Sequence, residues 1–118
     1  MATTSTTIAD VQYPFGNADV QAPAYAATIA ATITDQMTII SPAQLTGALT
    51  LNLTINSGVR AGARILFVAV SDGTARTTTF GTGFTSPTLA GVISKTKAIE
   101  FVYDGTTFKA TSVGVQID

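Results

Sequence analysis

Residues 98–110 read Ala-Ile-Glu-Phe-Val-Tyr-Asp-Gly-Thr-Thr-Phe-Lys-Ala and place Asp104-Gly105 between two runs of β-forming residues. An Asp-Gly pair is one of the strongest hairpin signals, because both positions of a tight two-residue turn need a positive φ. Such a turn sets a register that pairs aromatic with aromatic on one face and opposite charges on the other. The pairs are Phe101 with Phe108 and Glu100 with Lys109. A slip of one residue loses both, so the sequence predicts a β-hairpin in this register.

Residues 49–55 alternate between apolar and polar side chains without a break. This period of two predicts a strand with one buried face, as in an antiparallel sheet. Residues 63–70 differ, since both faces are apolar after Arg64. That pattern is typical of a strand that lies between two layers or presents one face to another subunit. Asp72-Gly73 follows and predicts a second hairpin turn.

Other β-rich segments, separated by turn residues, bring the number of predicted strands to about eight. They cover residues 24–34, 36–41, 75–80, 88–93, 98–103 and 106–113, and residues 115–117 can extend the last of them. No segment has a helical pattern. We therefore expect an all-β fold, a single antiparallel β-sandwich or jelly-roll-like barrel that spans residues 24–118.

Residues 1–23 have a different composition, rich in Thr and Ala and then interrupted by Pro and Gly. The interruptions disfavour a helix or a long strand, so we expect an extended N-terminal arm. Tyr13, Phe15 and Val20 favour an arm that docks onto another surface, because solvated tails rarely carry such side chains. A frayed terminus is the alternative.

The surface that this composition can supply is poor in charge. Of the 118 residues, 11% are charged and 46% are hydrophobic, the net charge is −1, and threonine makes up about a fifth. Such a surface favours a homo-oligomer whose neighbours cover it, with a neutral, threonine-coated monomer as the alternative. Nucleic acid is not an expected partner, because basic residues are few. We expect Arg60, Arg64 and Arg76 to cluster near one end of the sheet as inter-subunit salt-bridge partners.

Residues that carry catalysis or bind metals are scarce. The chain has no Cys and no His, so it lacks a thiolate nucleophile and the usual general base for a serine. Its carboxylates are not spaced as an acid–base pair on one element. Asp72 and Asp104 are explained by turn formation, with Ca²⁺ ligation at loop tips as the alternative. We therefore expect no enzymatic activity, no cofactor and no bound metal.

No signal sequence or membrane-spanning run is visible in the sequence, so we expect no membrane partner. Residues 1–8 lack a basic and an apolar region, and the longest apolar run, residues 65–70, has only the length of a strand. Some aromatic side chains could stack on sugar rings, namely Tyr13, Tyr25, Phe84 and Tyr103. For Phe84 and Tyr103 we expect packing in the core instead.

Three stretches together resemble a β-domain that is common in virion proteins of tailed bacteriophages. They are Leu-Thr-Gly-Ala-Leu-Thr-Leu-Asn-Leu at 45–53, Gly-Ala-Arg-Ile-Leu-Phe-Val-Ala-Val-Ser-Asp-Gly-Thr-Ala-Arg-Thr-Thr-Thr-Phe-Gly-Thr-Gly-Phe at 62–84, and Phe-Val-Tyr-Asp-Gly-Thr-Thr-Phe at 101–108. Similar domains occur in capsid decoration proteins, head fibres and tail fibres. The resemblance covers about 70 residues and excludes the N-terminal arm. Phe108 stands where similar sequences often have Trp.

The resemblance implies a structural protein of the virion that forms a homotrimer. A single domain with a short arm suits a small capsid decoration protein. Such a protein would bind the major capsid protein or another virion protein through its arm and through inter-subunit contacts. The matching motifs bring no catalytic residues. The alternative is a receptor- or glycan-binding tip domain of a phage fibre or tail, and a weaker one is a bacterial surface or spore-type β-domain.

Overall fold

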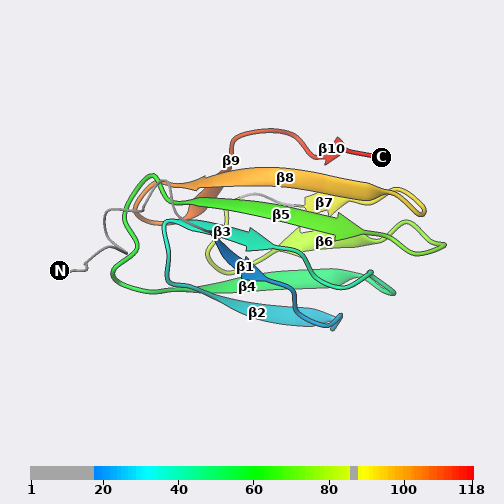
Figure 1. The fold of residues 1–118 in the computed structure, drawn as a ribbon, viewed down its shortest axis with the longest axis horizontal. Helices are drawn as coiled ribbons and strands as arrows, with labels where there is room; N and C mark the ends of the chain where they lie inside the picture. The colour runs from blue at the N-terminus through cyan, green and yellow to red at the C-terminus, as the bar shows by residue number, and fades with distance from the viewer. Residues whose placement is uncertain (1–17, 86–87) are drawn as a thin grey trace.

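A computed structural model describes residues 18–85 and 88–118 of the protein. These residues form strands and no helix, so none of them makes a helix that could cross a membrane. The strands are β1 (Asp19–Gln21), β2 (Thr28–Ile33), β3 (Met37–Ile40), β4 (Leu49–Ile55), β5 (Arg64–Val70), β6 (Thr77–Phe80), β7 (Thr88–Ala90), β8 (Thr96–Tyr103), β9 (Phe108–Ala110) and β10 (Val115–Gln116). The all-β prediction is confirmed, and the strands lie in two sheets (Figure 1).

The first six strands are wound as a coil that alternates between the sheets. β1, β3 and β5 pair in parallel in the six-stranded sheet, and β2, β4 and β6 pair in parallel in the four-stranded one. Antiparallel pairing joins β6 to β7 and joins β8 to β5, β9 and β10. The prediction of an antiparallel sandwich is therefore wrong, because both sheets are mixed. The connections from β1 to β6 cross between sheets instead of folding back beside the strand they leave.

Apolar side chains from both sheets meet between them in a sandwich-like arrangement. In β4, Leu49, Leu51 and Leu53 are buried, whereas Thr50 is partly exposed and Thr54 is exposed. The same alternation occurs in β2, β5 and β6, so each strand contributes one face to the core. The buried apolar residues are Ile29, Ala31, Ile33, Ile40, Leu45, Leu49, Leu51, Leu53, Val59, Ala63, Ile65, Phe67, Ala69, Phe80, Leu89, Ile99, Phe101 and Phe108.

A cluster of aromatic rings joins the two sheets. The ring of Phe80, from the four-stranded sheet, lies 5.4 Å from Phe67 and 4.8 Å from Phe101 of the other sheet, centroid to centroid and edge to face. Phe84, from the loop after β6, packs 4.9 Å from Phe80 and 4.8 Å from Phe101. Tyr103 stacks at 4.9 Å on Phe108. Edge-to-face and offset contacts of this kind stabilise a core beyond the area that they bury.

The hairpin at Asp104-Gly105 is present, but its register differs from the predicted one. Tyr103 pairs with Phe108, so four residues, 104–107, form the loop instead of two. The difference is a shift of two residues in the pairing. It leaves the aromatic side chains on the core face, because the side-chain period of a strand is two. It separates Glu100 from Lys109, and that predicted charge pair is wrong: Lys109 faces Val102 instead.

The side chain of Asp104 explains the longer loop. Its Oδ1 atom accepts hydrogen bonds from the N–H groups of Thr106 and Thr107, at 2.8 and 2.9 Å. This local turn holds Asp104 without a positive φ, whereas Gly105 has a φ of +98°. A two-residue turn of the predicted type needs a positive φ at both positions, so the Asp side chain favours the longer loop.

Asp72-Gly73 is not a hairpin turn, which corrects the second turn prediction. The strand before it, β5, lies in the six-stranded sheet, and the strand after it, β6, lies in the four-stranded sheet. The segment is therefore a connection that crosses between sheets. Gly73 has no positive φ, and a methyl group added there would meet nothing within 4 Å. The glycine is thus not required by the backbone at this position.

The boundary predicted for the N-terminal arm, residue 23, is also wrong. Asp19–Gln21 form β1, which pairs in parallel with β3 and belongs to the six-stranded sheet. Three residues suffice because β3 offers a ready edge to pair with. Val20 therefore lies in a strand of the domain, not in an arm. Tyr13 and Phe15 fall outside the described residues.

Candidate functional site

Apolar side chains form two rows on the outward face of the six-stranded sheet, and Glu100 lies beside Leu66 on the same face. The pairing register places Val20, Ile39 and Leu66 in one row across β1, β3 and β5. It places Val68, Ala98 and Val115 in a second row across β5, β8 and β10. Val20 is 63% and Val115 is 50% exposed, and the others are half-buried. These six residues are called the apolar face below.

The outward face of the four-stranded sheet has a different chemistry. Register pairs Thr28 with Thr50, Thr50 with Thr79, and Thr79 with Thr88, so one threonine from each strand lies in a single row. These four residues are called the threonine row. Adjacent strands are about 4.8 Å apart, so the hydroxyl groups are closely and regularly spaced. The molecule thus presents an uncharged polar face on one side and the apolar face on the other.

One ion pair lies on the strands that carry the apolar face. Arg64 Nη1 of β5 lies 3.6 Å from Glu100 Oε1 of β8, and the two side chains are 51% and 40% exposed. Because the charges cancel, the pair adds no net charge there. An exposed pair of this kind stabilises the fold little on its own. The Arg64–Glu100 pair is polar but has no net charge, and it lies next to the apolar face.

The three arginines predicted to cluster do not come together. Arg64 begins β5, whereas Arg76 follows β5 and precedes β6, so a strand of about 20 Å separates them. Arg60 lies near the Arg64 end, where its N–H donates to Gln36 Oε1 at 2.8 Å. Arg64 and Arg76 each form an ion pair within the chain. The prediction of one basic cluster is wrong, because Arg64 and Arg76 lie at opposite ends of the β5 strand.

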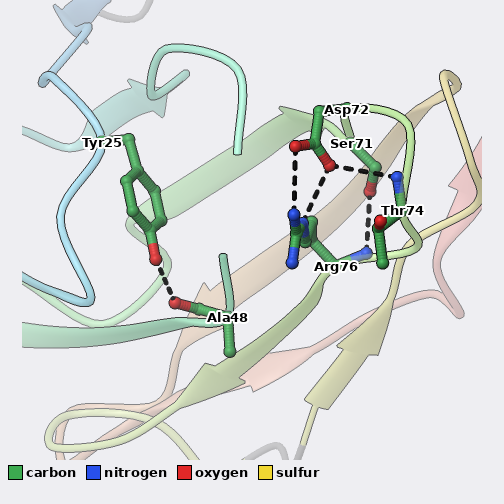
Figure 2. Close-up of polar contacts among 6 residues, drawn as sticks. All are labelled: Tyr25, Ala48, Ser71, Asp72, Thr74 and Arg76. Carbon is green, nitrogen blue, oxygen red and sulfur yellow. Dashed lines mark hydrogen bonds and ion pairs between the residues drawn. The ribbon is translucent and has the colours of Figure 1, made fainter. Parts of the chain in front are cut away.

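Figure 2 shows the loop between β5 and β6, where Asp72 holds Arg76 with two hydrogen bonds. Arg76 Nε donates to Asp72 Oδ1 at 2.8 Å, and Nη2 donates to Oδ2 at 3.1 Å. The N–H of Thr74 also donates to Asp72 Oδ1, and the N–H of Arg76 donates to Ser71 Oγ, both at 3.1 Å. The Arg76 guanidinium and the N–H of Thr74 hold the pKa of Asp72 below its usual value. Nearby, Tyr25 donates its hydroxyl proton to the Ala48 carbonyl at 2.8 Å (Figure 2).

Asp104 and Asp118 are also engaged within the chain. Lys109 Nζ bonds to Asp104 Oδ2, and this bond together with the N–H donors of Thr107 and Thr106 lowers the pKa of Asp104. Asp118 Oδ1 accepts from the N–H of Thr96 at 2.7 Å, which lowers the pKa of Asp118. Since these oxygens already have donors, the carboxylates act as structural acceptors. No group of three or more acidic side chains in residues 18–85 and 88–118 is placed to hold a metal ion.

Two of the aromatic side chains that could contact sugars are packed against the core, as predicted. Phe84 and Tyr103 are partly buried and belong to the aromatic cluster. Tyr25 packs against the core as well. Tyr13 lies outside the described residues. The described aromatic rings are therefore used for packing and do not form an exposed stacking platform.

The lowered carboxylate pKa values predict a loss of stability in acid. A carboxylate whose pKa is lower in the folded state contributes stability above the unfolded-state pKa, here 3.8 for Asp104, and loses it as the pH falls towards the folded-state pKa. We expect the free energy of unfolding to decline below about pH 4. Asp104→Asn keeps an oxygen for the Thr106 and Thr107 N–H groups but removes the charge, so the decline should flatten. Urea unfolding from pH 7 to about 2 measures this, and an unchanged slope would contradict it.

The chain matches no model of a known protein family and no curated protein. Sequence patterns missed the threonine row and the apolar face, although the alternating residues of each strand are visible in the sequence. Rows across a sheet depend on which strands pair and in which register, and that information is not local.

Proposed function

We propose that the protein is a structural component of a virion, a small capsid decoration protein that assembles with copies of itself and with the major capsid protein or another shell protein. The observation that carries this proposal is the apolar face. Isolated apolar side chains are normal on a monomer, but two adjacent rows across one sheet favour an interaction surface.

Charge supports the same reading. The chain has a net charge of −1, and the ion pair of Arg64 with Glu100 leaves the strands of the apolar face without net charge at that point. A subunit can cover a neutral, apolar surface without burying an unpaired charge. Burial of an unpaired charge would cost several kcal/mol. Interfaces of permanent assemblies are apolar in this way.

The alternative, a receptor- or glycan-binding tip, has less support. Its expected contact residues, Phe84 and Tyr103, are partly buried in the aromatic cluster. Loop tips such as residues 104–107 remain as candidate contacts. No second function is favoured by a specific feature of the described surface.

The proposal is tested with phage particles that lack this protein, to which purified protein is added before sedimentation. We expect the wild type to bind and the double variant Leu66→Lys/Val68→Lys to bind at least about tenfold more weakly, since two buried lysines would be left unpaired. Thr79→Lys is the matched control, because it adds a lysine to an exposed position on the opposite face. Equal binding by the double variant would exclude the apolar face as the contact.

Removal of residues 1–17 tests the arm separately. This deletion leaves β1 in place, whereas a deletion to residue 23 would remove it. If the arm anchors the protein, the shortened protein should remain folded by circular dichroism but lose binding to particles. Electron microscopy of particles with bound protein then tests its place on the shell. Absence from the shell in such images would refute the decoration role.

A further inference from the structure

Among residues 18–85 and 88–118, no strand pairs with the outer edge of β2. β2 is the border strand of the four-stranded sheet, and its one described neighbour is β4 (Figure 1). Its sequence, Thr-Ile-Ala-Ala-Thr-Ile, contains no charge and no proline. Proteins usually protect an exposed edge with a lysine, a proline or a bulge, because an open edge pairs readily with another strand. The described residues give β2 no charge, proline or bulge at this edge, so the edge is available to pair with another strand.

The direction of the free backbone groups follows from the pairing with β4. The carbonyl of Ala27 accepts from the N–H of Thr50, and that of Ile33 accepts from the N–H of Asn56, each at 2.9 Å. The N–H and C=O groups of successive residues in a strand point to opposite sides. The backbone groups of the odd-numbered residues of β2 therefore point towards β4. The N–H and C=O groups of residues 28, 30 and 32 face away, towards the edge.

Most of these edge groups have no partner among the described residues. The carbonyl of Thr32 accepts from Gln21 Nε2 at 2.9 Å. No described residue bonds to the backbone N–H groups of Thr28, Ala30 and Thr32, or to the carbonyls of Thr28 and Ala30. A carbonyl has two lone pairs, so Thr32 can accept a second hydrogen bond beside that of Gln21.

We propose that β2 pairs antiparallel with β2 of a second copy of the chain, around a two-fold axis at Ala30. In this register Ala30 faces Ala30 of the second copy, and Thr28 faces Thr32. In an antiparallel ladder, pairs of residues that exchange two hydrogen bonds alternate with pairs that exchange none. In this register the even-numbered residues of β2 form the hydrogen-bonded pairs, so every outward N–H meets an outward C=O of the second copy. The two four-stranded sheets become one continuous sheet.

The occupant is a second copy because the edge is complementary to itself. The outward residues read Thr28, Ala30, Thr32, which is the same in both directions, as an isologous contact requires. On the outer face each threonine meets a threonine, and such cross-strand pairs stabilise a sheet. On the core face Ile29 meets Ala31, so apolar contacts continue from one copy to the next. Ala30 at the axis leaves room for close approach.

This inference deepens the proposed function, since it names the surface through which copies assemble. It can fail independently, because self-association is measured without any particle. A protein that pairs through β2 but does not bind particles would refute only the decoration role. A protein that binds particles without β2 pairing would refute only this inference.

Charge substitutions at Thr28 and Thr32 test the register. Thr28→Lys/Thr32→Lys places like charges opposite each other twice across the axis, and should weaken dimerisation about tenfold or more. Thr28→Lys/Thr32→Glu places opposite charges at the same two contacts and should restore it. Both positions are exposed on the outer face, so neither variant disturbs the core. Thr79→Lys, two strands from the edge, is the control that should change nothing.

Sedimentation equilibrium of the full chain over a range of micromolar concentrations measures the result, with circular dichroism to verify folding. We expect a mass of twice the 12.1 kDa chain for the wild type, the control and the opposite-charge variant. A monomeric or trimeric wild type would overturn the proposal. So would a like-charge variant that dimerises as the wild type does, or an opposite-charge variant that is folded but monomeric.

Discussion

Replacing Phe101 with alanine should lower the free energy of unfolding by about 3–5 kcal/mol. Phe101 is fully buried, and its ring lies 4.8 Å from those of Phe80 and Phe84. The substitution removes a large apolar side chain and leaves a cavity between the two sheets. Because a domain of this size is typically stable by about 5–15 kcal/mol, much of the total would be lost. The chain has no Trp, so tryptophan fluorescence cannot report unfolding. Urea unfolding followed by far-ultraviolet circular dichroism measures the change in free energy.

Ile93→Ala is the matched control for this prediction. Ile93 is 56% exposed and lies outside the buried core, so its truncation should change stability by no more than about 0.5 kcal/mol. Phe84→Ala should have an intermediate effect, because Phe84 is only partly buried although it belongs to the same cluster. A Phe101→Ala protein as stable as the wild type would mean that the aromatic cluster does not join the sheets.

Local patterns predicted the strands well, because a strand with one buried face shows alternating apolar and polar residues in the sequence. The alternation at Leu49–Ile55 predicted the bounds of β4 and its buried face correctly. It did not predict the strands beside β4 or their direction. Thr50 pairs with Thr28 on one side and Thr79 on the other, each more than twenty residues away. Parallel strands in a sheet that has one face exposed to solvent are unusual. The prediction of an antiparallel sheet therefore followed the commoner case.

The two Asp-Gly pairs show the limit of turn signals. Asp104-Gly105 does lie in a hairpin, yet hydrogen bonds from the Asp104 side chain lengthen its loop and shift its register. Asp72-Gly73 has the same two residues but crosses between sheets, where Asp72 binds Arg76 instead. The dipeptide is compatible with both outcomes. The choice depends on what the following strand pairs with, which the local sequence does not contain.

Replacing Gly91 with alanine should lower the free energy of unfolding by about 1–3 kcal/mol or more. A methyl group at Gly91 would approach the carbonyl oxygen of Arg76 and Ser71 Oγ closer than 3.0 Å. The Arg76 carbonyl belongs to the backbone and cannot move aside as a side-chain tip can. Gly91 thus permits the close approach of the segment after β7 to the loop that Asp72 and Arg76 form. The cost arises from steric overlap, because Gly91 has no positive φ.

Gly73→Ala is the control for this prediction, since Gly73 lies in the β5–β6 loop that Gly91 contacts and has open space around it. Its backbone has no positive φ, so alanine should be neutral or should stabilise by up to about 1 kcal/mol through the unfolded state. Thermal unfolding of both variants measures the contrast. If Gly73→Ala were the more damaging of the two, the turn prediction from the Asp-Gly pair would be right and the crossing loop wrong. If both were neutral, the close approach at Gly91 would not exist in solution.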